Sequence, residues 1–146
     1  MTDSVPPSCP FCDVAAGDGA GHVVCGDEIA VGFLDARPVF KGHVLLIPRR
    51  HVETLTDLPA GLVGPFFERV QAMAGAVETG LAAAGTFVAV NNRVSQSVPH
   101  LHVHIVPRNR KDGLRGFFWP RTKYADDAEA ASYAARIREA ASGPRG

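Results

Sequence analysis

The chain has 146 residues, of which 46% are hydrophobic and 21% are charged. This length is typical of one domain, and the composition argues against disorder, a fibrous repeat or a membrane protein. Fifteen Lys and Arg residues balance fifteen Asp and Glu residues, so the chain lacks the broad positive surface that attracts a nucleic acid or an anionic membrane. We expect neither as a partner, and any phosphate group must be bound at a local site.

Cysteine usage and the first residues indicate the compartment. The chain has three cysteines, too few for a disulfide framework, and its first residues lack the basic and apolar regions of a signal peptide. Both observations favour a reducing compartment, and we expect the cytoplasm. Residues 1–8, with two prolines and no apolar pattern, are predicted to be a flexible tail, followed by a single domain over residues 9–142.

Short apolar runs predict the strands. The runs 22–25 and 28–34 are separated by Gly26-Asp27, which predicts a β-hairpin. Residues 42–48 form an apolar run between Gly42 and Pro48, too short for a helix, and predict a buried strand. Residues 87–90 and 100–106 predict two more strands.

Two segments predict helices. Asp57 can cap the start of a long helix that ends at Gly85, because apolar residues between them repeat with a helical period: Phe66, Val70, Met73, Val77 and Leu81. The Ala-rich stretch 126–142, with Asp126 or Asp127 as its cap and Ile137 on its apolar side, predicts a C-terminal helix. Strands outnumber helices and most connections are short, so we expect an α+β fold with an antiparallel β-sheet.

Three of the six histidines lie within five residues, at His100, His102 and His104. Alternate side chains of a strand share a face, so the three histidines project together while Leu101, Val103 and Ile105 face the core. A solvated strand face is the plain interpretation, and strict alternation disfavours it. A single metal ion cannot bind all three, because His100 and His104 are about 13 Å apart along a strand and Zn–N bonds are about 2.0–2.1 Å. We expect His100 to serve one site and the other two histidines a second.

The run from His100 to Ile105 resembles the His-φ-His-φ-His-φ signature of the histidine triad superfamily of nucleotidyl hydrolases and transferases, where φ is an apolar residue. The resemblance extends from Cys9 to Arg108 and implies the same fold. Residues 113–124, which include Phe117-Phe118-Trp119-Pro120, look like an additional segment of bacterial members. Other matching segments occur in the order of the family: Phe33-Leu34-Asp35 with Pro38, Gly42-His43, Ile47-Pro48 with His51, Asn91, and Gln96-Ser97.

The resemblance implies a role for each matching residue. In similar proteins the middle histidine attacks the α-phosphate of a nucleotide, which assigns the nucleophile to His102. His104 then bonds the phosphate oxygens and the departing group, and His43 and Ser97 act at the same site. The remaining matching residues would bind the nucleotide, Asp35 through the ribose hydroxyls and Asn91 and Gln96 through the sugar or phosphate region. The implied substrate is a purine nucleotide conjugate of the adenosine phosphoramidate or dinucleoside polyphosphate type.

Three functions are compatible with this pattern. The first is hydrolysis, in which water discharges a nucleotidyl-His102 intermediate. The second is nucleotidyl transfer or phosphorolysis, in which phosphate or a sugar phosphate takes the place of water. The third is a nucleotide-binding interaction module without catalysis, which is disfavoured because binding alone requires no nucleophile. The resemblance also implies a homodimer, paired through the long helix and a sheet edge.

The segment Asn91–Gln96 departs from the family pattern. It is shorter than expected, and Arg93 and Ser95 stand where family members often have glycine. Glycine permits backbone conformations that other residues resist, so we expect the loop over the phosphate to differ. The difference bears on the leaving group of the substrate, and we expect the Arg93 side chain to be solvated.

The spacing of Cys9 and Cys12 suits either a metal site or a redox pair. A redox pair normally begins a helix, and the sequence after Cys12 shows little helical pattern, which favours the metal. Bacterial histidine triad proteins with a similar cysteine pair bind zinc there. The resemblance thus implies a structural Zn²⁺ site of the Cys₂His₂ type formed by Cys9, Cys12, His51 and His100, which leaves His102 free.

Overall fold

The computed structural model describes residues 9–19, 21–114 and 121–142 of the chain. Contacts divide the chain into two compact units, Met1–Asp112 and Gly113–Gly146. The tail predicted over residues 1–8 and the segment Phe117-Phe118-Trp119-Pro120 lie outside the described residues. The single domain expected over residues 9–142 stays a prediction.

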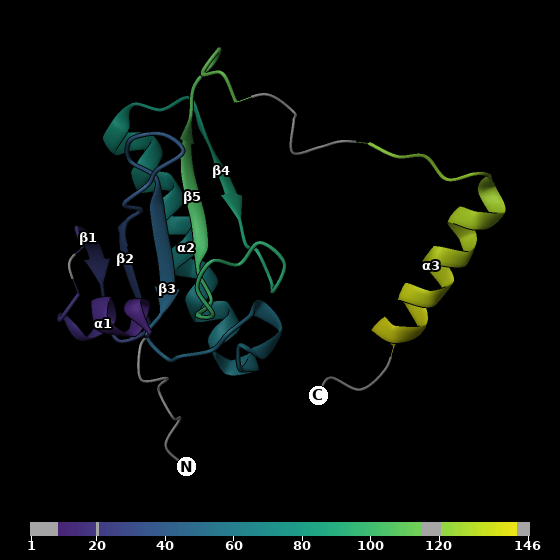
Figure 1. Ribbon diagram of the computed structural model, residues 1–146, viewed down its shortest axis with the longest axis horizontal. Coiled ribbons are helices and arrows are strands. Elements are labelled where there is room, and N and C mark those ends of the chain that lie inside the picture. Colours follow the sequence, from purple (N-terminus) through teal and green to yellow (C-terminus); the bar gives the residue numbers. More distant parts are fainter. Residues whose placement is uncertain (1–8, 20, 115–120, 143–146) are drawn as a thin grey trace. The chain divides into compact units, whose positions relative to one another are not determined.

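The first unit is built on a five-stranded sheet in the order β1-β2-β3-β5-β4, in which every neighbouring pair is antiparallel (Figure 1). The predicted α+β fold with an antiparallel sheet is therefore confirmed. The strands are β1 Val23–Gly26, β2 Ala30–Leu34, β3 Val44–Pro48, β4 Gly85–Ala89 and β5 Val103–Arg108.

The predicted hairpin joins β1 to β2. Asp27 stabilises the turn, because its Oδ1 accepts hydrogen bonds from the backbone N–H groups of Ile29 and Ala30 at 2.9 and 3.0 Å. An aspartate that bonds the backbone two residues ahead is a common turn device. The second strand begins at Ala30 rather than at Glu28, because Glu28 and Ile29 belong to this turn.

The long helix α2 spans Ala60–Leu81, and both of its predicted ends need correction. Asp57 caps the short 3-10 helix η1, Leu55–Asp57, where its Oδ2 accepts from the Thr54 backbone N–H at 3.1 Å. At the other end, Ala82 adopts the left-handed conformation with φ 50° and stops the helix. Gly85 is the first residue of β4.

The sheet is covered on both faces because its central strands are apolar on both sides. The apolar stripe of α2 packs on one face. The short helix α1, Pro10–Ala16, packs on the other through Phe11, Val14 and Ala15. In β3, Val44 and Leu46 belong to the first cluster, and Leu45 and Ile47 belong to the second, as alternation along a strand requires.

The histidine segment differs in part from the expected strand. The strand β5 begins at Val103, so His100 and His102 precede it. Leu101, Val103 and Ile105 face the α2 side and are fully buried, as predicted. The histidine side is not a solvated face, because His100 is 0% and His102 is 3% exposed. Buried imidazoles require polar partners, which the next subsection identifies.

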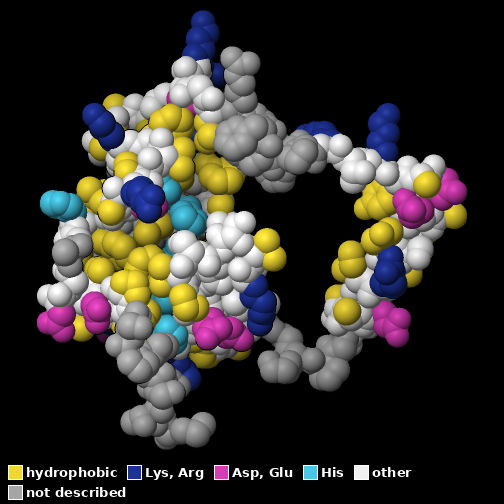
Figure 2. All heavy atoms as spheres, in the orientation of Figure 1, with side chains coloured by type: hydrophobic (Ala, Val, Ile, Leu, Met, Phe, Trp, Pro, Cys, Tyr) yellow, Lys and Arg dark blue, Asp and Glu magenta, His cyan; other side chains and the backbone are white. Residues whose placement is uncertain are grey.

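The second unit contains the C-terminal helix α3, Asp127–Ala141. The Asp126 side chain caps it by accepting from the Glu129 backbone N–H at 2.8 Å, as predicted. Its larger apolar side chains, Tyr133 and Ile137, are exposed, and Figure 2 shows hydrophobic side chains on the surface of this helix. Among the described residues, no helix has the length and apolar character that crossing a membrane requires.

Candidate active site and metal centre

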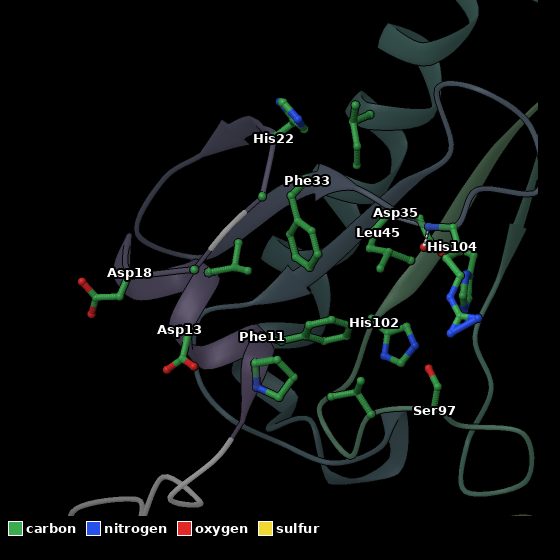
Figure 3. A pocket seen from close by; sticks show the side chains of 18 residues that line it. Phe11, Asp13, Asp18, His22, Phe33, Asp35, Leu45, Ser97, His102 and His104 are labelled. Atoms are coloured by element: carbon green, nitrogen blue, oxygen red, sulfur yellow. Dashed lines mark hydrogen bonds between the residues drawn. The ribbon is translucent and has the colours of Figure 1, made fainter.

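A cleft of about 1200 Å³ lies on the face of the sheet that α1 covers. Apolar side chains of α1, β2 and β3, among them Phe11, Phe33 and Leu45, line its middle. Figure 3 shows His102, His104 and other polar side chains gathered at one end of this apolar wall. The cleft therefore offers an apolar slot for a ring system beside a cluster of imidazoles.

A single hydrogen bond determines which ring nitrogen of His102 carries the proton. Its Nδ1 lies 2.7 Å from the backbone carbonyl oxygen of His100. A carbonyl only accepts, so Nδ1 carries the proton and donates it, and in the neutral ring Nε2 keeps its lone pair. The Nε2 lone pair of His102 is thus available at the cleft that this residue lines.

His43 and His104 form a second pair whose tautomers are fixed in the same way. The backbone N–H of Val39 donates to His43 Nδ1 at 3.1 Å, so the proton of neutral His43 lies on Nε2. This Nε2 is 3.0 Å from His104 Nδ1, which accepts from it. His104 consequently carries its own proton on Nε2, where it can donate to a ligand.

The pair is uncharged near neutral pH. Burial, together with the neighbouring His102 and His43, lowers the pKa of His104 to about 4. Burial also lowers the pKa of His43, although nearby Asp35 acts in the opposite direction. Both imidazoles are therefore hydrogen-bond donors with fixed tautomers rather than cations.

Asp35 and Ser97 also line the cleft, and their predicted contacts with a nucleotide stay predictions. Asp35 follows β2, and its Oδ1 accepts from the Arg37 backbone N–H at 2.9 Å. Its Oδ2 lies 3.7 Å from His43 Nε2, too far for a hydrogen bond. Figure 3 shows the Ser97 hydroxyl directed toward His102. Both side chains thus have oxygen atoms available to a ligand.

Asn91 and Gln96 lie outside the described set of residues that line the cleft. The Gln96 amide is used within the protein, because its Oε1 accepts from the Arg93 backbone N–H at 2.8 Å and its Nε2 donates to the Glu53 carbonyl at 2.5 Å. Asn91 is exposed. Their nucleotide contacts stay predictions, and the structure gives Gln96 a visible function in holding the loop before Ser97.

The loop Asn91–Gln96 keeps a glycine-like backbone without glycine. Arg93 has φ 68° and Ser95 has φ 61°, both in the left-handed region. This conformation costs a residue with a Cβ atom about 1–2 kcal/mol. The bond from the Arg93 N–H to Gln96 helps to offset this cost. Arg93 is exposed, in agreement with the expectation of a solvated side chain.

Arg93→Gly should therefore stabilise the protein. Glycine removes the steric cost of φ 68° but makes the unfolded chain more flexible, so we expect a net gain of roughly 0.5–1 kcal/mol in the free energy of unfolding. Urea denaturation measures it. Arg50→Gly, at an exposed position without positive φ, is the matched control and should destabilise. A loss of stability in Arg93→Gly would contradict the strain argument.

The four predicted metal ligands come together from three distant segments. His51 Nδ1 and His100 Nδ1 are 3.1 Å apart, and Cys12 Sγ lies 3.2 Å from His51 Nδ1. Cys9 Sγ and Cys12 Sγ lie 3.4 and 3.5 Å from His100 Nδ1. Bonds of about 2.0–2.3 Å to a tetrahedral Zn²⁺ place ligand atoms roughly 3.3–3.8 Å apart. The four separations lie inside this range or within about 0.2 Å of it, so the four side chains can hold a zinc ion.

The protonation of the cluster also suits a metal. His100 Nε2 donates to the Pro48 carbonyl at 2.9 Å, so its Nδ1 lone pair faces the cluster. Burial lowers the pKa of His100 to about 4, which keeps this ligand neutral. Burial and the neighbouring Cys9 raise the pKa of the Cys12 thiol to about 12. A bound cation reverses that effect, because zinc takes cysteine as the thiolate.

The expectation of little helix after the cysteine pair is wrong. The helix α1 begins at Pro10, and Cys9 caps it, with Sγ accepting from the Cys12 backbone N–H at 3.3 Å. Proline at the first helical position favours this start. A cysteine pair at a helix start is also the redox arrangement, so the helix does not separate the two interpretations. His51 and His100 do, because they complete a four-ligand set.

Two contributors to the site were missed by the sequence analysis. Phe11 packs against His102, and the Val39 backbone N–H sets the tautomer of His43. Phe11 had a sequence signal, because it stands between the two metal cysteines. The function of Val39 had none, because any residue except proline supplies a backbone N–H.

Comparisons with known proteins agree with this geometry. The sequence-family model described as "HIT domain" matches residues 17–111 of this chain. The protein "Protein hit" of Bacillus subtilis (strain 168) is 36% identical over 122 residues, which cover 82% of this chain and 83% of the relative. The chain therefore belongs to the HIT family, whose name refers to the histidine triad.

Solved structures extend the likeness to the whole fold. A HIT family member from Bacillus subtilis superposes with a TM-score of 0.80 and 31% identity, over 90% of this chain and 95% of that one. A Zn-bound histidine triad family protein from Mycobacterium smegmatis has a TM-score of 0.69 and 33% identity, over 91% and 97% of the two chains. With the cysteine–histidine cluster, this relative identifies zinc as the cofactor of the present chain.

Removal of one zinc ligand should release the metal. We expect about one zinc per chain in the wild type and far less in Cys9→Ser, because three remaining ligands bind a structural zinc poorly. Cys25→Ser is the matched control, since Cys25 lies outside the cluster and should leave the zinc content unchanged. Elemental analysis of the purified proteins measures the metal. Full zinc content in Cys9→Ser would contradict the assigned ligands.

Proposed function

We propose that this chain is a nucleotide-binding hydrolase that cleaves nucleotide conjugates at the α-phosphate through a covalent nucleotidyl-His102 intermediate. The observation that carries the proposal is the hydrogen bond from His102 Nδ1 to the His100 carbonyl, which leaves the Nε2 lone pair on the cleft wall. Every neutral histidine has one unprotonated nitrogen, but a purely structural histidine would not need to place it beside a cleft. Membership of the HIT family supports the same chemistry.

In the first step, His102 Nε2 attacks the α-phosphorus. The bond from phosphorus to the leaving group breaks, and the leaving group departs with the bonding electron pair. A polyphosphate departs as an anion, and the amine of a phosphoramidate takes up a proton from solvent as it departs. The His102 ring then carries the positive charge, and its Nδ1 proton remains bonded to the His100 carbonyl. The Nε2–H group of His104 and the Ser97 hydroxyl are placed to donate to phosphate oxygens and to the departing group, where negative charge develops.

In the second step, water attacks the same phosphorus atom. The P–Nε2 bond breaks, its electron pair returns to His102, and the proton lost by the water passes to solvent. His43 keeps His104 in the correct tautomer throughout, because Val39 N–H holds the other nitrogen of His43. The nucleoside monophosphate is released and the neutral His102 is restored.

The shape of the cleft suits a purine nucleotide. The base would lie against the apolar wall of Phe11, Phe33 and Leu45, and the ribose hydroxyls would bond to Asp35, which lies beside His104 in Figure 3. Asn91 and Gln96 are proposed to contact the sugar or phosphate when the loop is occupied. This order places the α-phosphate at the histidine end of the cleft.

Two relatives with named activities support cleavage of such substrates. Adenylylsulfatase HINT3 of Arabidopsis thaliana is 30% identical over 108 residues. Bis(5'-nucleosyl)-tetraphosphatase [asymmetrical] of Schizosaccharomyces pombe is 33% identical over 87 residues. Their names indicate different leaving groups. For the present chain, phosphoramidates and dinucleoside polyphosphates are the proposed classes, and a panel of both compared by kcat/KM identifies the better one.

Transfer to phosphate or a sugar phosphate is the second candidate, because the same intermediate can react with either acceptor. The accessible Ser97 and the open histidine end of the cleft leave room for an acceptor larger than water. Formation of a nucleoside diphosphate when inorganic phosphate is added distinguishes this reaction from hydrolysis. A non-catalytic binding module is disfavoured by the fixed tautomer of His102.

The homodimer is also a proposal. The strand β4 lies at an edge of the sheet, and Val88 on it is 43% exposed. Leu81 at the end of α2 is 52% exposed. A second copy of the chain would cover these apolar side chains and pair with the sheet along the edge strand β4. A reducing cytoplasm is the proposed location, in keeping with three free cysteines.

His102→Ala should abolish covalent catalysis while the nucleotide still binds. We expect kcat to fall by about 10⁴-fold or more, because the attacking atom is removed and the rest of the cleft remains. The wild type is mixed with substrate and quenched in alkaline denaturant, in which the acid-labile P–N bond survives. Label at the α-phosphate should then remain on the protein, whereas label in the leaving group should be lost from it. Near-normal turnover in the variant, or no protein-bound α-label in the wild type, would refute the mechanism.

Asp35→Ala should weaken discrimination against 2′-deoxy substrates. The carboxylate would accept hydrogen bonds from the ribose hydroxyls, so its removal should raise KM for the ribonucleotide more than for the deoxynucleotide, by about tenfold. The ratio of kcat/KM for the two substrates is the measurement. Asp57→Ala is the control, because Asp57 belongs to η1 and is outside the described set of residues that line the cleft. An unchanged ratio in Asp35→Ala would show that Asp35 does not read the ribose.

A further inference from the structure

The residue between the two zinc cysteines touches the reactive histidine. The ring centroids of Phe11 and His102 are 5.0 Å apart, and the rings are nearly perpendicular, at 84°. Phe11 also lies 5.2 Å from the Phe33 ring, at 66°. Edge contacts of this kind are favourable and directional. Phe11 therefore joins the metal centre, the apolar wall of the cleft and His102.

His102 is held by a small number of contacts, and two of them come from the segments that bind zinc. The carbonyl of His100, a zinc ligand, accepts from Nδ1 at 2.7 Å and fixes one edge of the ring. A hydrogen bond at one edge leaves the ring free to tilt about that bond. The Phe11 ring and the His104 ring, whose centroids each lie 5.0 Å from that of His102, restrict this tilt.

The position of Phe11 depends in turn on how α1 is held. This helix has seven residues, and none of them is fully buried. A helix of this length is not stable alone. Its C-terminal end is tied by the Arg49 guanidinium, whose Nη1 donates to the Ala15 carbonyl at 2.7 Å. Its N-terminal end is tied at Cys9 and Cys12, the ligands on either side of Phe11.

We propose that Phe11 is a positioning residue for His102, which keeps the Nε2 lone pair aimed at the α-phosphate. This inference rests on the proposed function, in which His102 is the nucleophile. A displacement of a reacting atom by about 1 Å can cost on the order of 100-fold in rate. Cys9 and Cys12 therefore do more than attach α1 to the rest of the unit. They also position Phe11, and the Phe11 ring contacts the His102 ring.

The plain alternative is that Phe11 only fills apolar space. Phe11→Leu separates the two functions, because leucine keeps apolar volume against Phe33 but presents no flat ring edge to His102. Phe11→Tyr keeps the ring and should restore the wild-type behaviour. Val77→Ala is the stability control, since Val77 is a buried residue of α2 on the opposite side of the sheet.

The first measurement is the single-turnover rate of protein labelling at saturating α-labelled substrate. We expect Phe11→Leu to keep its zinc and to react more slowly by about tenfold or more, whereas Phe11→Tyr and Val77→Ala react at nearly the wild-type rate. Saturation removes the effect of weaker binding to the cleft wall. A wild-type rate in Phe11→Leu, or an equal loss in Val77→Ala at equal loss of stability, would overturn the proposal.

The second measurement does not depend on turnover. Nitrogen-15 NMR of the imidazoles reports the tautomer of His102 and the exchange of its Nδ1 proton with water. We expect one tautomer with a protected proton in the wild type and Phe11→Tyr, and faster exchange or a second tautomer in Phe11→Leu. Identical His102 signals in all three proteins would refute positioning by Phe11. Absence of substrate cleavage by the wild type would instead refute the proposed function, and the NMR comparison would still decide on Phe11.

Discussion

The hydrogen bond from His102 Nδ1 to the His100 carbonyl is the interaction on which the site depends. Both residues are buried, so an unsatisfied donor or acceptor here would cost about 1–3 kcal/mol. The bond removes that cost and at the same time chooses the tautomer of His102. The acceptor belongs to the backbone of His100, which is part of the cysteine–histidine cluster, so this cluster and His102 lie within three consecutive residues. Movement of one disturbs the other.

The unequal covering of the two sheet faces explains where the cleft lies. The 22 residues of α2 cover one face with a continuous apolar core. The seven residues of α1 cover only part of the other, and the uncovered part is the cleft. A short helix with no fully buried residue gains little from packing. Coordination of zinc by Cys9 and Cys12 supplies the missing stabilisation and therefore holds one wall of the site.

Hydrogen bonds hold the histidines of the site in single tautomers, and burial keeps His43 and His104 uncharged. Burial lowers the pKa of both His43 and His104 below the usual histidine range, so each ring has one donor and one acceptor at neutral pH. The pairing of His43 with His104 follows from the register of β3 against β5, which places Leu45 opposite His104. A chain of two neutral imidazoles delivers a donor to the cleft without a buried charge, which would be costly.

Local periodicity, turn residues and the spacing of His100, His102 and His104 were enough to predict the α+β class, the hairpin, the long helix and the candidate site residues. The other features depend on contacts between residues that are distant in the sequence. The four zinc ligands come from three segments separated by dozens of residues, and only the folded sheet brings their atoms within bonding distance of one ion. Sequence periodicity also does not predict three other features: the start of α1 next to Cys9, the left-handed backbone of Arg93, and the contact of Phe11 with His102. Each arises because long-range packing and metal ligation select a conformation that the local sequence disfavours or leaves open.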